Sequence, residues 1–397
     1  MPPAAVGRAP GPSPTSPAAA PRPPLALAGS PYEIGREHGR LLGGEIGAFL
    51  ADRHARVNLL RRTPLHGRAL TRRVRPFLEQ IERHLPDVAE ELHGLAAGAA
   101  IPIESATLLQ VRRELIGYVP FPSGECSTLA QARPGRGPFI AQTIDLNGGV
   151  SSLGALLRVE QRTARGAPDY VMYTLSGLLG FAGMNDAGVA VGINLVLAGR
   201  WRPGIPPYLL VRHLLNQTSV EACIDELARL PRSSSRALTL CDAHRVVTVE
   251  MTVDQHRVLE GGPMLHTNHF LHPDLVPADR MNPFSRRSSR DRLQLLRERL
   301  PATDTDAPAE VFGLLADHSL YPVGICAHAD GNVRREETVA ALLMEPAMGV
   351  FHAVLGQPCT APVTRVQLPR AAARSARPHP IGAPPLAALP PSSASNR

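Results

Sequence analysis

The sequence predicts an α+β fold in which a helical region precedes a long strand-rich region. Within residues 31–115, apolar side chains recur at spacings of three and four between Leu78 and Leu95, as on one face of a helix. From residue 126 onward, apolar runs are separated by short turns rich in glycine, asparagine and aspartate, which is typical of antiparallel strands. Helices segregated from antiparallel strands are characteristic of layered α+β architectures.

The helical region contains three features with a direct structural meaning. Pro86 is expected to break or kink the periodic helix, because proline lacks an amide hydrogen. Gly35 and Gly39 are expected to permit close packing between helices. His38 stands between them, and we expect it to be a packed or capping residue and not a catalytic one.

The region after residue 126 is expected to alternate strands with separate helices. Thr218 and Glu221 have the spacing of a capping box at the start of one helix. Strands are predicted at 127–132, 138–146, 153–162, 169–175, 178–184, 188–196, 236–242, 245–252 and 256–260. Helices are predicted at 207–216, 219–229, 286–299 and 307–317.

The charge lies mainly in the two ends of the chain. Residues 1–24 and 370–397 are rich in proline, alanine and serine, contain no acid, and hold six of the seven net positive charges. We expect both to be disordered tails, because they have little to bury. The nearly neutral body argues against a nucleic-acid partner. Between the tails, residues 25–125 form a predicted helical segment and residues 126–369 a predicted catalytic segment.

The five cysteines are widely spaced, with no CxxC pair and no familiar metal-ligand spacing. We therefore expect no metal, no zinc and no other cofactor. All of them except Cys126 are expected to be small buried apolar residues: Cys223, Cys241, Cys326 and Cys359. Free thiols suit a reducing compartment, and we find neither a signal peptide nor a membrane span, so a cytoplasmic location is expected. All basic residues are arginine, and the alanine and proline content suggests a bacterial, GC-rich genome.

Residues 124–147 carry the strongest functional signal. They read as two short strands around a turn in which Gly135 and Gly137 supply positive φ. Cys126 opens the first strand, and Asp145 stands near the end of the second. A hairpin brings these two residues beside each other. A cysteine at a strand start with a carboxylate folded back onto it suits a nucleophile that becomes a new chain terminus.

The sequence here resembles peptidase family C45, the isopenicillin N acyltransferase-like N-terminal nucleophile (Ntn) hydrolases. The resemblance extends from about residue 29 to about residue 368 and implies a four-layer αββα sandwich. It is carried by five blocks in the family's order: Gly29–Gly39, the 124–147 hairpin, Gly183–Gly192, His266–Leu271, and Ile325–His328 with Gly356–Cys359.

The resemblance implies roles for four residues. The Glu125–Cys126 bond is expected to be cut autocatalytically, which frees the Cys126 α-amine as general base for its own thiol. Asp145 is expected to orient that thiol and amine, and Asn268 to donate a hydrogen bond to the oxyanion. His266 and His269 flank Asn268, and we expect both to be structural.

Two positions depart from the family's pattern. Many relatives have glycine where this chain has Glu125, and a bulkier residue there is expected to slow cleavage without forbidding it. Many relatives have arginine where this chain has Ala327, which puts the substrate class in doubt. Arg290 or Arg292 is a candidate to compensate for that arginine.

The function expected is that of an autoprocessed cysteine acyltransferase or amidohydrolase acting on amide or thioester bonds. Its partners would be a small-molecule acyl donor, such as acyl-CoA or another thioester, an amine or water as acceptor, and its own two cleavage fragments. Two alternatives remain open: a pure amide hydrolase without transfer, and an unprocessed scaffold or binding protein of the same fold.

Overall fold

The computed structural model covers the whole chain, and its description here extends over residues 22–52, 57–60, 63–117, 126–147, 149–163, 166–321, 324–330 and 335–370. Glu125 and the predicted cleavage bond on its carboxyl side therefore lie outside the described residues, as do residues 1–21 and 371–397 of the two predicted tails.

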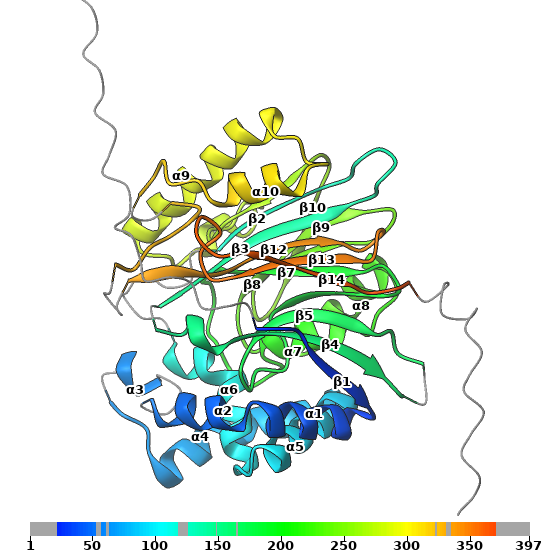
Figure 1. The fold of residues 1–397 in the computed structure, drawn as a ribbon. Coiled ribbons are helices and arrows are strands. Elements are labelled where there is room, and N and C mark those ends of the chain that lie inside the picture. Colours follow the sequence, from blue (N-terminus) through cyan, green and yellow to red (C-terminus); the bar gives the residue numbers. More distant parts are fainter. Residues whose placement is uncertain are drawn as a thin grey trace, which may run out of the picture.

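The described chain forms two stacked β-sheets between two layers of helices (Figure 1). The helices are α1 Pro31–Leu41, α2 Gly43–Ala51, α3 Val57–Leu60, α4 Gly67–His84, α5 Pro86–Gly98, α6 Ile103–Ile116, α7 Pro207–Leu214, α8 Val220–Arg229, α9 Pro283–Arg299 and α10 Pro308–Leu315. The strands are β1 Leu25–Gly29, β2 Ser127–Gln131, β3 Phe139–Asn147, β4 Gly154–Gln161, β5 Tyr170–Leu175, β6 Ala182–Asn185, β7 Ala190–Leu195, β8 Arg236–Cys241, β9 Val246–Met251, β10 His256–Glu260, β11 Met264–His266, β12 Glu336–Glu345, β13 Val350–Leu355 and β14 Val363–Gln367. The expected α+β class and αββα layering are confirmed.

The two sheets differ in strand order and in the helices that cover them. The larger sheet has the order β1-β4-β5-β6-β7-β8-β9-β10, and the smaller has the order β11-β2-β3-β12-β13-β14. β2 and β3 pack against β7 and β8, so the sheets face each other across the middle of the molecule. α9 and α10 cover the outer face of the smaller sheet, where Leu296, Val311 and Phe312 meet Phe139 and Leu343 (Figure 1). The helices before β2 lie beyond the larger sheet.

The close packing of α1 on α5 depends on glycine, as predicted. A Cβ added at Gly35 would lie 1.9 Å from the Glu91 carbonyl oxygen, and one added at Gly98 would lie 1.9 Å from the Arg36 carbonyl oxygen. A Cβ added at Gly94 would lie 2.1 Å from the Tyr32 carbonyl oxygen, and one added at Gly39 would lie 2.4 Å from the Leu95 carbonyl oxygen. The backbones therefore touch directly, and no other residue type fits at these positions. The expected break at Pro86 is also confirmed, since α4 ends at His84 and α5 begins at Pro86.

Three features differ from the sequence-based expectation. Residues Leu25–Gly29 lie at the start of the region expected to be helical, yet they form a strand that pairs in parallel with β4. No strand was predicted after residue 260, but that part of the chain adds β11 to β14 to the smaller sheet. The predicted capping box at Thr218 is wrong: the Ser219 side chain caps α8 by accepting the Ala222 amide hydrogen, because the helix begins one residue later than predicted.

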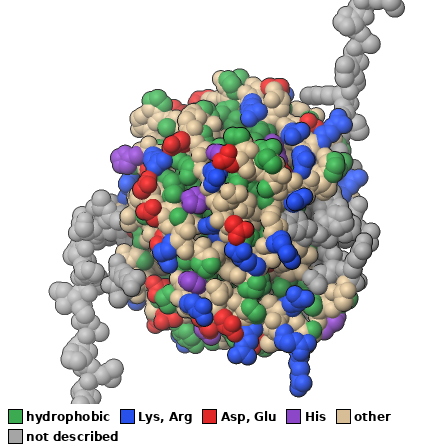
Figure 2. All heavy atoms as spheres, turned by 180° about the vertical axis from the view of Figure 1, so that it is seen from behind, with side chains coloured by type: hydrophobic (Ala, Val, Ile, Leu, Met, Phe, Trp, Pro, Cys, Tyr) green, Lys and Arg blue, Asp and Glu red, His purple; other side chains and the backbone are tan. Residues whose placement is uncertain are grey.

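The surface of the described residues mixes charges. On the face shown in Figure 2, arginine and acidic side chains are interspersed and form no continuous basic band. Within the described ranges, no single helix is long and apolar enough to cross a membrane; α5 and α6 pass that test only as a pair bent by 118°.

Candidate active site

Cys126 lies at the head of β2, which stands between the edge strand β11 and β3 in the smaller sheet. β2 pairs with β3 in the register Ser127↔Thr143, which places Asp145 diagonally across from Cys126. Thr143 fixes the start of the strand, because its hydroxyl accepts the Ser127 amide hydrogen at 3.2 Å. The Cys126 thiol is only 5% exposed and accepts a hydrogen bond from the Asp145 backbone amide. The hairpin therefore brings the predicted pair together as expected.

The neighbour of β2 on its other side carries Asn268 towards Cys126. β11 pairs His266 with Thr128, so the chain leaving β11 passes the start of β2. The Asn268 side chain donates to the Leu195 carbonyl oxygen at 3.0 Å, and the Ser289 hydroxyl accepts its backbone amide hydrogen at 2.8 Å. Both contacts lock the orientation of the Asn268 side chain, and its second Nδ2 hydrogen has no acceptor among the described residues.

Arg292 of α9 joins these groups. Its side chain is fully buried, and its Nη1 donates to the Cys126 carbonyl oxygen at 3.0 Å and to the Ser127 hydroxyl at 2.9 Å. Its Nη2 donates to Oδ1 of Asn268 at 2.9 Å. One planar guanidinium thus holds the residue that bears the thiol and the predicted oxyanion donor in a fixed relation. Arg290, the other arginine considered as a compensation for Ala327, is exposed.

The Cys126 carbonyl oxygen has a second donor. Nδ2 of Asn194, at the end of β7, lies 3.2 Å from it, and Oδ1 of Asn194 accepts from the Thr128 hydroxyl at 2.8 Å. Because β7 belongs to the larger sheet and β2 to the smaller one, these bonds connect the sheets at the candidate site.

The Asp145 carboxylate is buried and oriented from β12. The Thr338 hydroxyl donates to Oδ1 of Asp145 at 2.7 Å. That hydroxyl accepts the backbone amide hydrogen of Ala327 at 2.9 Å, and the Thr338 amide donates to the Ala327 carbonyl oxygen at 3.0 Å. The backbone of Ala327 therefore supports Asp145 through Thr338.

The surroundings of Cys126 oppose ionisation of its thiol in the uncut chain. Burial, followed by the negative charge of Asp145, raises the pKa of Cys126 to about 12, although the Asp145 amide and Arg292 act in the opposite direction. At neutral pH the thiol is therefore protonated, and a reaction at sulfur requires a base close to it.

The three histidines that were expected to be structural lie in supporting positions. Burial lowers the pKa of His38 to about 4, so its ring is neutral, and its Nε2 accepts the Gly177 amide hydrogen at 3.4 Å. His266 contacts Glu250 at 2.9 Å, and His269 contacts the Ser289 hydroxyl at 2.7 Å. No hydrogen bond joins a histidine to the Cys126 thiol among the described residues.

Sequence reasoning missed two residues of this site and assigned a third no definite role. Thr338 gave no signal, because it lies 193 positions from Asp145 in a region where no strand was predicted. Tyr173 also gave none: it is fully buried within electrostatic reach of Cys126, and its hydroxyl has no hydrogen-bond partner in the described part of the chain. Asn194 lies within the predicted strand 188–196, and its side-chain amide satisfies the Cys126 carbonyl oxygen.

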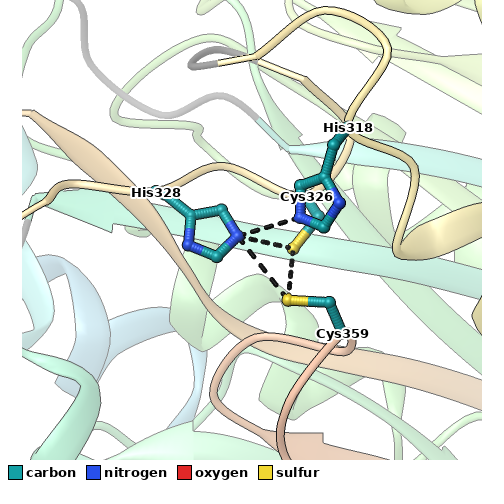
Figure 3. Close-up of side chains that lie close together, drawn as sticks. All are labelled: His318, Cys326, His328 and Cys359. Atoms are coloured by element: carbon teal, nitrogen blue, oxygen red, sulfur yellow. Dashed lines mark hydrogen bonds between the residues drawn. The ribbon is translucent and has the colours of Figure 1, made fainter. Parts of the chain in front are cut away.

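A second group of reactive side chains lies in the loop between α10 and β12 and the loop between β13 and β14. We call it the Cys2His2 cluster (Figure 3). It consists of His318, Cys326, His328 and Cys359. The expectation that Cys359 is a buried apolar residue is wrong, because this side chain is exposed in the loop after β13. No spacing in the sequence indicates this cluster, since the fold brings the four side chains together from two distant loops.

A cavity of about 360 Å³ lies elsewhere, beside α4 and α6. Its lining includes Arg72, Arg73, Phe77 and Trp201. None of the residues that surround Cys126 lines this cavity, so we assign it no part in the chemistry at sulfur.

Comparisons with known sequences show the family of the chain. Residues 132–360 match the family described as acyl-coenzyme A:6-aminopenicillanic acid acyl-transferase. A curated relative, the 40 kDa form of acyl-coenzyme A:6-aminopenicillanic-acid-acyltransferase of Emericella nidulans, is 28% identical over 323 residues, which is 77% of this chain and 85% of the relative.

Solved structures give more distant likenesses. The penicillin V acylase of Agrobacterium tumefaciens aligns with a TM-score of 0.40 and 14% identity, over 61% of this chain and 86% of that one. A mutant of the conjugated bile acid hydrolase of Clostridium perfringens aligns with a TM-score of 0.41 and 12% identity, over 61% and 92%. Because the family match covers more than half of the sequence, the chain belongs to the acyl-coenzyme A:6-aminopenicillanic acid acyltransferase family of enzymes.

Proposed function

We propose that the protein is an autoprocessed cysteine acyltransferase or amidohydrolase that acts through an acyl-Cys126 intermediate. The observation that carries this proposal is the position of Cys126: its thiol accepts the Asp145 amide hydrogen, and its carbonyl oxygen is held by Asn194 and Arg292. A nucleophile fixed by its own backbone at a strand head is suited to work as a chain terminus.

Maturation is proposed to begin with an intramolecular acyl shift at the Glu125–Cys126 bond. Sγ of Cys126 attacks the Glu125 carbonyl carbon, a C–S bond forms as the C–N bond breaks, and the departing nitrogen takes up a proton. Water then hydrolyses the thioester, which leaves a carboxylate on Glu125 and a free thiol and α-amine on Cys126. The charge on Glu125 does not prevent this sequence, because that side chain takes no part in it.

The new α-amine supplies the base that the uncut site lacks. Its ordinary pKa is about 8, so part of it is neutral near pH 7 and accepts the thiol proton. The buried Asp145 carboxylate attracts the resulting ammonium, and the Asp145 amide hydrogen stabilises the thiolate. The Asp145 amide therefore favours the thiolate, whereas the Asp145 carboxylate favours the ammonium.

The acyl-transfer cycle follows from that ion pair. The thiolate attacks the carbonyl carbon of an amide or thioester, and Asn268 donates its second amide hydrogen to the oxyanion. The leaving amine or thiol receives the proton held by the α-amine. An amine or water then attacks the acyl-cysteine thioester and regenerates the thiol. Arg292 is a positioning residue, because it orients Asn268 and Cys126 through their oxygens.

The substrate class is proposed from the family description. That description names an acyl-coenzyme A donor and an amine acceptor, 6-aminopenicillanic acid. We propose that this chain likewise uses a small-molecule acyl donor, acyl-CoA or another thioester, with an amine or water as acceptor. The cytoplasmic location expected from the free thiols stays a prediction.

The two fragments are proposed to remain associated after cleavage. β1 pairs with β4 in one sheet across the proposed cut, and Gln110 of α6 donates to the Gly177 carbonyl oxygen at 2.7 Å. Glu91 of α5 forms an ion pair at 2.7 Å with Arg212 of α7, and both side chains are buried. Separation would expose this charge pair together with the shared apolar core.

The test is product analysis with purified protein, a panel of acyl-CoA thioesters and an added amine. We expect release of CoA and a covalent acyl adduct on Cys126, with an amide product when the amine is present. Cys126→Ala should abolish both, whereas Cys223→Ala, which alters a buried cysteine of α8, should preserve both. Acid product alone would establish hydrolysis without transfer. A wild-type protein that forms no adduct with any donor of the panel would contradict the proposal and favour a scaffold.

A further inference from the structure

The Cys2His2 cluster lies where two loops of the smaller sheet meet. His318 follows α10, Cys326 and His328 precede β12, and Cys359 lies between β13 and β14. Figure 3 shows the two sulfurs and the two imidazoles pointing towards a common centre. One ligand atom from each residue lies within 4.8 Å of all the others. These residues take no part in the chemistry proposed for Cys126.

The distances inside the cluster match a tetrahedron of zinc ligands. With Zn–S bonds of about 2.3 Å and Zn–N bonds of about 2.0–2.1 Å, ligand atoms are separated by about 3.8 Å for S···S and about 3.6 Å for S···N. The two sulfurs are 3.8 Å apart, and Nε2 of His328 lies 3.6 Å from each of them. The edge between the two imidazole nitrogens, at 2.9 Å, must lengthen slightly to admit the ion.

The donor set selects the metal. Two thiolates and two imidazoles suit Zn²⁺, whereas Mg²⁺ and Ca²⁺ require oxygen ligands. We propose that the Cys2His2 cluster binds one zinc ion in a closed, structural site. Four protein ligands fill the tetrahedron and leave no position for substrate or water. The exposed side of Cys359 gives the ion a route of entry.

The ion would stabilise the segment that supports Asp145. Cys326 and His328 flank Ala327, which exchanges two hydrogen bonds with Thr338. Thr338 in turn donates to the Asp145 carboxylate. Fixing both neighbours of Ala327 to the β13–β14 loop therefore holds this chain of bonds in place. The consequence is structural and is independent of whether the enzyme transfers or hydrolyses acyl groups.

Metal analysis of full-length protein, purified without chelators and without oxygen, tests the proposal. We expect about one zinc per chain and a lower Tm after the ion is removed with a chelator. Cobalt(II) added to the metal-free protein should give the visible bands of a tetrahedral site and a near-ultraviolet thiolate band. These readouts do not depend on Cys126 or on activity, so a failure of the acyl-transfer proposal would not be confused with a failure here.

Substitutions test whether the bound zinc depends on the residues of the Cys2His2 cluster. Cys359→Ala removes an exposed ligand with little cost in packing, and it should lose most of the bound zinc; His318→Ala should do the same. Cys223→Ala, remote from the cluster, should keep the full zinc content. Protein with five titratable thiols that binds neither zinc nor cobalt would overturn the proposal. So would a Cys326–Cys359 disulfide in the protein purified without oxygen.

Discussion

At the scale of single residues, the candidate site depends on Arg292, whose side chain binds two residues that are far from each other in the sequence. Arg292 binds the Cys126 carbonyl, 166 positions away, and Asn268, 24 positions away. Its contacts require two nitrogens of one rigid plane, which lysine cannot provide. Burial leaves no water to replace a lost contact.

The first prediction follows from this geometry. Arg292→Lys keeps the charge but cannot bridge both oxygens, so we expect turnover to fall by about a hundredfold, in the range seen when an oriented donor is lost. Arg290→Lys, two positions away on the exposed side of α9, is the matched control and should leave turnover unchanged. Steady-state kinetics of the two variants decides between these outcomes. Equal rates in both variants would show that Arg292 has no positioning role.

The second prediction concerns the two residues proposed to stabilise charge. Asp145→Asn and Asn268→Ala should fold but lose turnover by about a hundredfold or more, because each removes a group that acts in the transition state. Exposed Asp254→Asn serves as the control. Circular dichroism and kinetics on the same samples separate folding from activity. Full activity in either variant would remove that residue from the mechanism.

At the scale of elements, the third prediction concerns the glycines at the contact between α1 and α5. Gly98→Ala places a methyl group 1.9 Å from a backbone oxygen, so the helices must separate, and we expect a loss of stability of about 3 kcal/mol or more. Gly44→Ala in α2 meets nothing within 4 Å and should gain about 0.5–1 kcal/mol from helix propensity. Denaturant unfolding measures both. A similar small effect at both sites would contradict the packing account.

The fourth prediction uses His38 of α1, which packs against the loop after β5. Burial lowers its pKa to about 4, whereas the unfolded chain binds a proton below about pH 6.5. The stability contribution is therefore complete above pH 6.5 and is lost as the pH falls towards 4. The loss is on the order of 3 kcal/mol. His38→Gln should reduce the loss of unfolding free energy between pH 6.5 and 4. The substitution of an exposed histidine, His93→Gln, should not reduce it. Unfolding curves between pH 7 and 4 provide the measurement.

The local pattern of apolar and turn residues predicted strands well where a strand pairs with the next strand in the sequence. The hairpins from β2 to β10 follow alternation and turn residues, and Gly135 and Gly137 have φ of 73° and 79° as expected. β1 and β11 to β14 were missed. β1 is five residues long and pairs with a strand 132 positions later, while β12 pairs with β3 in the register Thr338↔Asp145, 193 positions apart and with four helices between them in the chain. Long-range pairing decides such strands, and periodicity does not report it.

The same distinction applies to the candidate site. Cys126 and Asp145 share one hairpin, so their proximity could be predicted from sequence. Thr338 and the Cys2His2 cluster depend on loops brought together by the whole smaller sheet, and no spacing in the sequence indicates them. Only the folded chain brings these residues together.

At the scale of the whole molecule, the ends of the chain make the fifth prediction. Arg22 forms an exposed ion pair with Glu45, and Arg370 donates to the Ala347 carbonyl oxygen, so both contact the body. Residues 1–21 and 371–397 offer few apolar side chains to bury. Deleting these two segments should leave Tm and processing unchanged. A large decrease in either would show that one of the segments docks on the body.

The proposed N-terminal nucleophile forms only if the chain is cut before Cys126. Residues before and after the Glu125–Cys126 bond contribute to the same layers. The buried ion pair of Glu91 and Arg212 joins the two parts of the chain. A cut protein should therefore migrate as one particle under native conditions and as two chains when denatured. Cys126→Ala should remain a single chain in both conditions.

Intact-mass analysis of denatured, active wild-type protein, combined with N-terminal sequencing, is the most direct test. The account predicts two chains, residues 1–125 and 126–397, the second of which begins with Cys126. Active protein found as one uncut chain would contradict the N-terminal nucleophile mechanism, even if Cys126 proved essential.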